Sequence, residues 1–437
     1  MPEVALLERI DGLELFPAFG RVRRVASGVI DASGPDASVG AHCEIVSSDP
    51  DVPALRAQIV SLSPQGVRLT PFGGTSGVRI GDKVRLLGKG GAALAGDSLA
   101  GRAVDPLGRA LDGGLPIHVD RHRPAMPAVL DRIAPTEPFA TGVRAIDGLL
   151  TLGKGQRIGI LAASGVGKTR LLEQIVRQAA SERLIVCLIG ERGREVEALW
   201  ADINASGRLA RTTLIAATSD ESAAMRALAL DQALSMAEFW RDRGEHVLLV
   251  ADSVTRHAMA LREIGLVAGE PPMLRAYTPN VLRELPRVVE RCGAVRGSGS
   301  ITGLFTVLSE GDEVDDPIVE VMKSLLDGHI VLSRRLAEAG HFPAIDIGRS
   351  LSRLFDGLVG SAQREAARAV RASLAKFEES RILVESGMYK PGADRELDQA
   401  IARRTAIADF LQQPSDISIA LTETVSRLAA LSEGKVA

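Results

Sequence analysis

The 437-residue sequence is poor in aromatic residues, which make up 3% of it, and it has only three cysteines. Cys43, Cys187 and Cys292 are scattered and form no C-x-x-C pair, which argues against a disulfide or zinc framework and for reduced thiols in a cytosolic protein. The histidines show no metal-ligand spacing. No apolar run approaches membrane-spanning length, and the first residues do not resemble a signal peptide. The net charge of −3 provides no basic field that would attract nucleic acid or anionic lipid.

The N-terminal region has two parts. Residues 1–19 carry apolar side chains at roughly helical spacing, which indicates either a helix packed on its own domain or a docking segment for a partner or a membrane surface. Residues 20–92 contain short apolar runs separated by Gly, Pro, Asp and Ser turns, which predicts a small β-barrel. The only aromatic residue of that range is Phe72, so an assembly role is favoured over nucleic-acid binding, which uses stacking aromatics.

The remainder of the chain has three parts. Residues 93–150 are rich in Gly and Pro, so we expect a connecting segment. In residues 151–360 apolar strand-like runs alternate with helical patterns, which predicts a mainly parallel sheet with helices on both faces. Such sheets bind ligands at the carboxyl ends of their strands. Residues 361–437 have the apolar spacing of helices, which predicts a C-terminal helical domain.

The stretch Gln156–Leu172 has the sequence QRIGILAASGVGKTRLL, in which a strand-like apolar run is followed by a glycine-containing loop and a helical pattern. This is the context that a P-loop requires, although an ordinary strand–helix turn can also contain glycine. Backbone N–H groups at Gly165 and Gly167 would cradle phosphate, Lys168 would reach the β- and γ-phosphates, and Thr169 would ligate Mg²⁺. The predicted nucleotide-binding residues are Ala162, Ala163, Ser164, Gly165, Val166, Gly167, Lys168 and Thr169.

The loop departs from the usual pattern G-x-x-x-x-G-K-[ST] at its first position, where this chain has Ala162. Alanine is acceptable there if its φ angle is negative, so we expect nucleotide binding to be retained.

Two carboxylates end neighbouring strand-like runs. Glu191 lies in GERGRE and would orient or activate the attacking water, while the alternative is a helix-start carboxylate in surface pairs. Asp252 ends VLLVAD, which is typical of the Walker B strand whose carboxylate holds Mg²⁺, usually through water. Many strands end in Asp, and the upstream P-loop is what favours the metal-binding interpretation.

The stretch Gly340–Arg353, GHFPAIDIGRSLSR, contributes two further candidates. Phe342 would stack on adenine, or alternatively belong to the core. Arg353 would act as an arginine finger that stabilises the transition state, or alternatively form a surface ion pair.

Taken together, GVGKT, IGERGREV, VLLVADSVTRHAMALREI, GEPP, GSITGLFTVLSEGDEVDDPI, DGHIVLSRRLAEAGHFPAIDI and SLSR resemble the type III export ATPases, which are homologues of the rotary ATP synthase alpha and beta subunits. VRRVASGVIDASGPDASVGAHCEI and SGMYKPGADRELDQAI are most similar to the flagellum-specific ATPases, and the injectisome ATPases are close relatives. The resemblance implies a multidomain fold with a small N-terminal β-barrel, a central α/β RecA-like P-loop domain with a mainly parallel sheet, and a C-terminal helical domain.

The resemblance also implies residue roles. It makes Glu191 the catalytic glutamate, Arg192 a neighbour of the γ-phosphate, and Arg353 the arginine that reaches the next subunit's site. It makes Lys168 and Thr169 the phosphate and Mg²⁺ ligands and Asp252 the Walker B aspartate. It further assigns to the surroundings of adenine the two aromatic residues Phe342 and Tyr389.

The loop of the family commonly has glycine where this chain has Ala163, which affects how closely the loop approaches phosphate. Because one chain carries both Glu191 and Arg353, a ring of identical chains would have a complete site at every joint, so we expect a homohexamer. The implied partners are a stator-like regulatory subunit, a central-stalk coiled-coil protein, export-gate membrane proteins and chaperone–substrate complexes, with no nucleic acid. The implied location is cytoplasmic and peripheral at the inner-membrane export apparatus.

The expected activity is therefore ATP hydrolysis coupled to export of flagellar proteins. Three alternatives stay open: an injectisome ATPase, a non-catalytic nucleotide-binding ring subunit, and an RNA translocase. The presence of Glu191 argues against the non-catalytic subunit, and the net charge and the aromatic-poor barrel argue against the RNA translocase.

Overall fold

The computed structural model describes residues 19–88, 93–117, 121–122, 126–308 and 316–432. It divides into two compact units. One contains the barrel together with residues 220–227 and 259–281, and the other contains residues 93–219, 228–258 and 282–437. The docking segment predicted at 1–19 lies outside the described residues except for Phe19.

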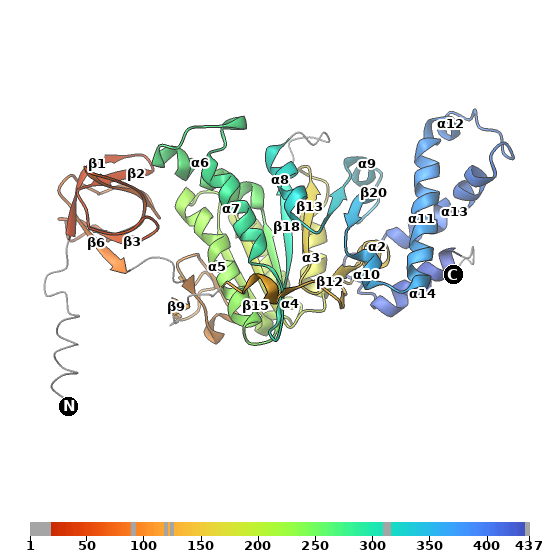
Figure 1. Ribbon diagram of the computed structural model, residues 1–437, viewed down its shortest axis with the longest axis horizontal. Helices are drawn as coiled ribbons and strands as arrows, with labels where there is room; N and C mark the ends of the chain where they lie inside the picture. Colours follow the sequence, from red (N-terminus) through yellow and green to blue (C-terminus); the bar gives the residue numbers. More distant parts are fainter. Residues whose placement is uncertain (1–18, 89–92, 118–120, 123–125, 309–315, 433–437) are drawn as a thin grey trace. The chain divides into compact units, whose positions relative to one another are not determined.

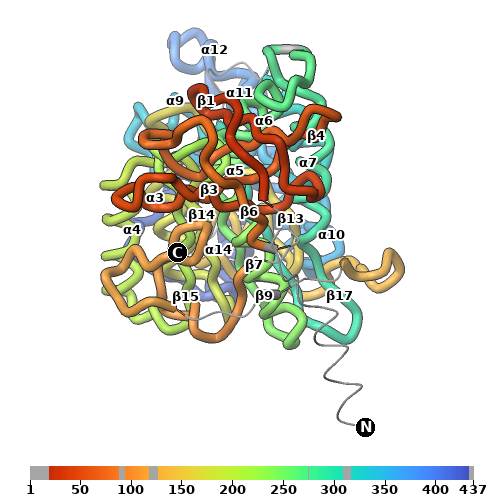
Figure 2. Tube along the Cα trace, turned by 90° about the vertical axis from the view of Figure 1, so that its left-hand side faces the viewer, coloured from red at the N-terminus to blue at the C-terminus, as the bar shows by residue number. Residues whose placement is uncertain are grey.

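The predicted barrel is confirmed and can be seen in Figures 1 and 2. Its six antiparallel strands close in the order β1-β2-β5-β4-β3-β6. Its strands are β1 (Phe19–Ala26), β2 (Val29–Ala32), β3 (His42–Val46), β4 (Leu55–Ser63), β5 (Gly66–Pro71) and β6 (Lys83–Gly88). Alternate residues such as Val22, Ile30 and Cys43 point inward and are almost fully buried, as the two-residue period of a strand requires. Gly20 is needed at a close crossing, because a Cβ there would lie 1.9 Å from the carbonyl oxygen of Gly34.

The predicted parallel sheet is also confirmed, with the strand order β20-β19-β13-β18-β16-β14-β15-β8. All neighbouring strands from β19 to β8 in this order pair in parallel. The pair β19 and β20 is antiparallel, and so is the pair of small strands β10 and β17. The strands are β8 (Ala103–Val104), β10 (Arg132–Ile133), β13 (Arg157–Ala162), β14 (Arg183–Ile189), β15 (Thr212–Ala217), β16 (His246–Asp252), β17 (Gly293–Val295), β18 (Ser300–Leu308), β19 (Gly328–Leu332) and β20 (Ile345–Ser352).

Two features of this sheet do not follow from the apolar pattern. β19 is short and begins at a glycine, and the apolar pattern of the sequence does not predict it. β8 and β10 come from residues 93–150, so this passage both connects the domains and extends the sheet. Two further pairs lie outside the sheet: β7 (Ala93–Leu94) with β9 (Arg121–His122), and β11 (Pro138–Phe139) with β12 (Leu152–Gly153).

Helices connect the strands and bury both faces of the sheet, since β16 is buried at every position. They are α2 (Arg144–Leu149), α3 (Lys168–Gln178), α4 (Gly193–Ala205), α5 (Ala223–Arg241), α6 (Val254–Ala268), α7 (Pro279–Glu290), α8 (Pro317–Leu325), α9 (Arg334–Glu338) and α10 (Phe355–Leu358), with 3₁₀ turns η1 (Asp97–Leu99), η2 (Val129–Asp131), η3 (Leu209–Arg211) and η4 (Leu274–Ala276). One large apolar cluster joins α3 and α4 to strand residues such as Ile160, Val186 and Val250.

The C-terminal helices are α11 (Ser361–Glu379), α12 (Arg381–Glu385), α13 (Arg395–Leu411) and α14 (Leu421–Ser432). The long α11 packs against α13 and α14 (Figure 1). Its Arg371 donates to the carbonyl oxygens of Leu149 and Ile347, at 2.7 and 3.1 Å. Its Gln363 donates to the carbonyl oxygens of Asp147 and Gly148, both at 3.2 Å, so side-chain hydrogen bonds fix the helix to the core.

Asp147 is a fully buried carboxylate at this junction. It accepts hydrogen bonds from the backbone N–H groups of Thr141 and Gly142 and from the Thr141 hydroxyl, at 2.7 to 3.0 Å. Burial raises its pKa to about 6, and these hydrogen bonds oppose that rise. The network orders the residues that connect β11 to α2.

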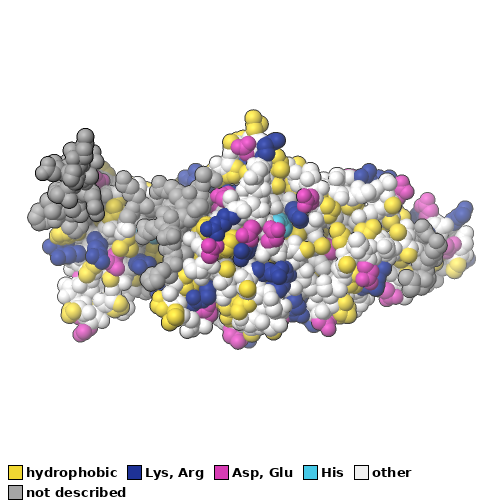
Figure 3. Space-filling model, turned by 90° about the horizontal axis from the view of Figure 1, so that it is seen from below, with side chains coloured by type: hydrophobic (Ala, Val, Ile, Leu, Met, Phe, Trp, Pro, Cys, Tyr) yellow, Lys and Arg dark blue, Asp and Glu magenta, His cyan; other side chains and the backbone are white. Residues whose placement is uncertain are grey.

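The mixed charge of the surface and the free thiols are as expected from the composition. Lys and Arg side chains are interspersed with Asp and Glu on the face shown in Figure 3, as expected from 52 basic and 55 acidic residues. The three cysteines are free and buried. Within the described ranges, every helix is too short or too polar to cross a membrane.

The crossing at Gly20 gives a test of barrel packing. Gly20→Ala is expected to destabilise the protein by about 1–3 kcal/mol, because the new methyl group forces the backbone near Gly34 to move. Thermal and urea unfolding of the full chain measure this. Gly74→Ala is the matched control, since its Cβ would meet no atom within 4 Å, and equal effects of the two substitutions would contradict the analysis.

Candidate functional site

The loop between β13 and α3 has the backbone that a phosphate cradle needs. β13 ends at Ala162 and α3 begins at Lys168. Gly165 and Gly167 have φ angles of 80° and 91°, in the left-handed region that favours glycine. Their N–H groups and the start of α3 therefore present donors to one point, which suits an anion.

Alanine is compatible with the two positions where the loop departs from the usual pattern. Among the described residues other than glycine, only Arg275 and Ala276 have positive φ. Ala162 and Ala163 consequently have ordinary backbone angles, and no strain accompanies the missing glycines.

Lys168 lies between the two carboxylates that the sequence analysis singled out. Its Nζ forms an ion pair with Oδ1 of Asp252 and lies 3.5 Å from Oε1 of Glu191. The side chains of Glu191 and Asp252 are only 13% and 5% exposed, so this cluster is shielded from bulk water. The three groups meet because β13, β14 and β16 are parallel and end at the same edge of the sheet.

Burial is the largest influence on Glu191 and raises its pKa. The positive charge of Lys168 opposes this rise, whereas the charge of Asp252 and a hydrogen bond with Glu195 add to it. A carboxylate with a raised pKa beside a phosphate-binding loop is suited to accept a proton from water or to orient it.

Thr306 on β18 is a functional neighbour that the sequence analysis missed. Its hydroxyl donates to Oδ1 of Asp252 at 2.6 Å and is fully buried. The available signal was a polar side chain within the apolar run SITGLFTVL, where it needs a buried partner.

Thr169, Glu191 and Asp252 line one small cavity of about 20 Å³. In the described part of the chain, no three His, Cys, Asp or Glu side chains are grouped to hold a metal ion. A hydroxyl and one or two carboxylates do fit Mg²⁺, which takes its remaining ligands from water and substrate phosphates. These residues therefore match the ligand preferences of Mg²⁺.

Phe342 lies against the other side of the loop, so close that a Cβ on Gly167 would be 3.2 Å from its ring. The Arg170 guanidinium lies 5.8 Å from the ring centroid. Both residues line a cavity of about 90 Å³ with Gln413 and Pro414, which follow α13. The structure thus brings a C-terminal loop to the phosphate loop, and sequence reasoning did not identify that loop.

Tyr389 does not line this cavity. Its hydroxyl lies 2.8 Å from Oδ1 of Asp398 and 3.0 Å from the carbonyl oxygen of Asp394, so it organises the turn before α13. The expected place of Tyr389 beside adenine stays a prediction.

The two predicted arginines are exposed. Arg192 precedes α4 directly after Glu191. Arg353 follows β20, where its backbone N–H donates to the Asp327 carbonyl at 2.9 Å and its side chain to that of Lys323 at 3.2 Å. Arg157, at the start of β13, also donates a hydrogen bond to Asp327. Arg353 therefore lies near the amino ends of the parallel strands, whereas the phosphate loop lies at their carboxyl ends.

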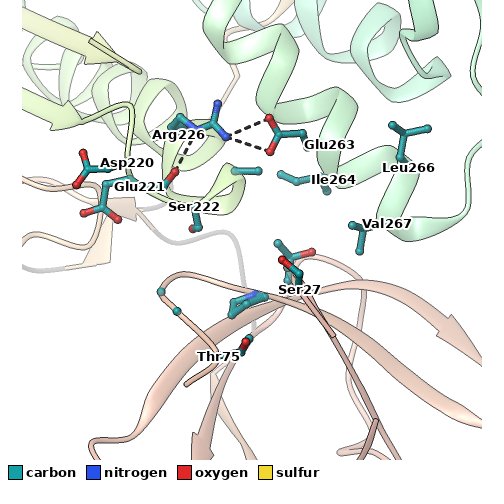
Figure 4. Close-up of a pocket in the computed structure, with 16 residues that line it drawn as sticks. Ser27, Thr75, Asp220, Glu221, Ser222, Arg226, Glu263, Ile264, Leu266 and Val267 are labelled. Atoms are coloured by element: carbon teal, nitrogen blue, oxygen red, sulfur yellow. Dashed lines mark hydrogen bonds and ion pairs between the residues drawn. The ribbon is translucent and has the colours of Figure 1, made fainter. Parts of the chain in front are cut away.

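A larger cavity, of about 670 Å³, belongs to the unit that contains the barrel. Arg226 pairs there with Glu263 at 3.0 Å, while Ser27 and Thr75 come from the barrel (Figure 4). None of the predicted nucleotide-binding residues lines it, so cavity size alone does not locate the chemistry.

A glycine loop before a helix, a lysine held by two carboxylates, and a parallel sheet that aligns them define a P-loop nucleotide-binding protein. The family model described as "ATP synthase alpha/beta family, nucleotide-binding domain" matches residues 142–352, and the beta-barrel domain of the same family matches residues 22–88. The "T3SS EscN ATPase C-terminal domain" matches residues 359–430. The chain belongs to the ATP synthase alpha/beta family, as its resemblance to export ATPases predicted.

Curated relatives and solved structures agree with this assignment. A "Flagellum-specific ATP synthase" of Bacillus subtilis is 38% identical, covering 99% of each chain. A "Type 3 secretion system ATPase" of Xanthomonas euvesicatoria is 41% identical, covering 99% of this chain and 98% of its own. The assembled ATPase EscN of enteropathogenic E. coli aligns with a TM-score of 0.88 at 39% identity, covering 94% of this chain and 100% of that chain.

The position of Lys168 between two carboxylates predicts that a Lys168→Met variant loses stability as pH rises. In Lys168→Met the pKa of Glu191 rises further, because the charge that lowers it is gone. The native variant then binds protons that the unfolded chain releases, so its free energy of unfolding falls as pH rises above about 4.5. We expect an extra loss on the order of 1 kcal/mol at pH 8 relative to pH 5, measured by urea unfolding.

Arg170→Met is the matched control, because it removes one charge from the exposed face of the same helix, away from both carboxylates. If Lys168→Met loses the same free energy at both pH values, the electrostatic account of Glu191 is wrong.

Proposed function

We propose that this chain hydrolyses ATP to ADP and phosphate and couples hydrolysis to the export of flagellar proteins through a type III secretion apparatus. The observation that carries the proposal is the largely shielded carboxylate of Glu191, 3.5 Å from the phosphate-loop lysine. A ring subunit that only scaffolds has no use for that group. Injectisome export is the second candidate, because type 3 secretion ATPases of other bacteria are as similar as the flagellar ones.

Phosphate binding uses the N–H groups from Ala163 to Lys168 and the Lys168 ammonium group. Asp252 and Glu191 hold that ammonium group beside the loop. When a triphosphate occupies the loop, Lys168 exchanges part of this pairing for the β- and γ-phosphate oxygens.

Thr169 and Asp252 are proposed to hold Mg²⁺, which neutralises charge on the phosphates. Thr306 orients the Asp252 carboxylate for this role by donating to Oδ1. Ala162 and Ser164 complete the loop, with Val166 buried beneath it.

Glu191 is proposed to hold the attacking water in line with the γ-phosphate and to accept its proton. Its low exposure limits competing water, and its raised pKa brings its proton affinity closer to what a base requires. Arg192, which follows it directly, is proposed to contact the γ-phosphate.

Arg353 is proposed to act on the site of a neighbouring chain. The five steps from Arg157 to Ala162 place it about 17 Å along the strand direction from its own loop, at ~3.3 Å per residue. An arginine that cannot reach its own phosphates and is exposed at the opposite edge can stabilise charge at a joint between identical chains. This supports a homohexamer whose sites need two protomers.

Several expectations remain part of the proposal. EscN has been solved with the central stalk EscO, which supports a stalk-like coiled-coil partner here. A stator-like subunit on residues 1–19, export-gate proteins, and chaperone–substrate complexes are further proposed partners, with no nucleic acid. We propose a cytoplasmic location, peripheral at the inner-membrane export apparatus. The proposed domains are 20–92, 93–150, 151–360 and 361–437.

Glu191→Gln tests the assigned chemistry. The amide keeps the size of the side chain but cannot accept the proton, so Mg²⁺-ATP hydrolysis is expected to fall by at least ~100-fold. Nucleotide binding, measured by calorimetry, is expected to persist. Hydrolysis within a few-fold of wild type would exclude Glu191 as the base, and the absence of ATP binding by the wild-type chain would exclude the whole proposal.

Mixing two inactive variants tests the shared site. Glu191→Gln and Arg353→Ala are each expected to hydrolyse ATP poorly. In a 1:1 mixture of dissociated chains, about a quarter of joints combine an intact Glu191 with an intact Arg353 from the neighbour, if assembly is random. Activity near a quarter of wild type is therefore expected, and a mixture no more active than its components would contradict the trans role.

A further inference from the structure

Gln174 on α3 is a buried polar side chain that the mechanism above does not use. It is 2% exposed, and its Nε2 atom has no hydrogen-bond partner within the described structure. Native proteins rarely leave a buried amide donor unpaired, since the group loses its water without compensation. A cavity-lining residue with such a donor is therefore a candidate to contact a ligand.

Gln174 lines the cavity that contains Phe342 and Gln413. Along α3 it follows Gly167, Arg170 and Leu171 at helical spacing, so these residues share one face of the helix. Its side chain thus belongs to the wall that continues from the phosphate loop.

The other buried amide of this cavity is already satisfied. Gln413 accepts a hydrogen bond from the backbone N–H of Arg144 at 2.9 Å. Its Nε2 donates to the carbonyl oxygens of Gly142 and Ile417, at 2.8 and 2.6 Å. Gln413 holds the C-terminal loop in place, which leaves Gln174 as the buried amide with a donor to spare.

The position of the cavity defines its occupant. Gly167 is part of the phosphate loop and of this cavity wall. A separate, smaller cavity lies on the other side of the loop. Glu191 and Asp252 line that cavity, which suits the reacting phosphate and a cation. A nucleotide with phosphates in the loop therefore has its base on the side of Phe342, where an aromatic ring and apolar side chains accept a planar group.

We propose that Gln174 is a base-recognition residue whose Nε2 donates to an unprotonated ring nitrogen of adenine, while Phe342 contacts the ring. This inference rests on the proposed function, because it assumes that ATP binds in the phosphate loop. Adenine presents N1, N3 and N7 as acceptors. Gln174 contributes to substrate binding and does not take part in the transfer step.

Gln174→Met tests the proposal, since methionine keeps the length and helix propensity of the side chain but removes the amide. We expect the affinity for ATP to fall roughly tenfold, which appears in KM with kcat nearly unchanged. Calorimetry with the full-length wild type and variant measures affinity for ATP, 1-deaza-ATP, 3-deaza-ATP and 7-deaza-ATP. One of these analogues, which lacks the accepting nitrogen, is expected to bind the wild type about tenfold more weakly than ATP does.

The decisive result comes from combining the Gln174→Met substitution with the nucleotide analogue that lacks the accepting nitrogen. The analogue that loses affinity for the wild type is expected to bind Gln174→Met no more weakly than ATP does, because both changes remove the same hydrogen bond. Gln399→Met, an identical replacement at an exposed position of α13, is expected to leave all four affinities unchanged. Thermal unfolding verifies that both variants are folded.

Two outcomes overturn the inference and leave the proposed function intact: unchanged ATP affinity in Gln174→Met, or an equal loss for ATP and all three analogues, which would indicate only a structural role. Failure of the wild-type chain to bind any of the nucleotides would instead overturn the proposed function itself.

Discussion

Burial of a parallel sheet on both faces is the constraint on which the site depends. Because β13, β14 and β16 run in the same direction, their carboxyl ends meet at one edge, and Lys168, Glu191 and Asp252 come together there. Their strands are apolar, so the polar groups at this edge are isolated from water and interact strongly with each other. The ammonium group between two carboxylates is the direct result.

The same edge is tied to the C-terminal helices. Gln413 links the cavity beside Phe342 to the backbone of Gly142 and Arg144, and Asp147 and Gln363 continue the network to α11. A base bound against Phe342 would therefore contact a loop that is fixed to both the sheet and the helices. This is a physical route by which nucleotide binding and the position of the C-terminal domain can influence each other.

Most of the fold and the core of the site could be predicted because they depend on local patterns. Glycines before G-K-T need left-handed backbone, and an apolar strand that ends in Asp delivers a carboxylate to the sheet edge. Other contacts could not be predicted in this way. Thr306 supports Asp252 from a different strand, and Gln413 reaches the loop from more than two hundred residues away, so neither has a local signature.

By itself the sequence determined the P-loop, the two carboxylates and the order of barrel, sheet and helices, since these follow from residue type and short-range periodicity, and its longer motifs identified the family by resemblance. Only the tertiary structure decided that Tyr389 turns to Asp398 instead of lining the cavity, that Gln174 has an unpaired donor, and that Arg353 lies at the edge away from its own loop. The physical reason is that hydrogen-bond satisfaction and the direction of a side chain are set by what packs around it, and packing joins residues that are far apart in the chain.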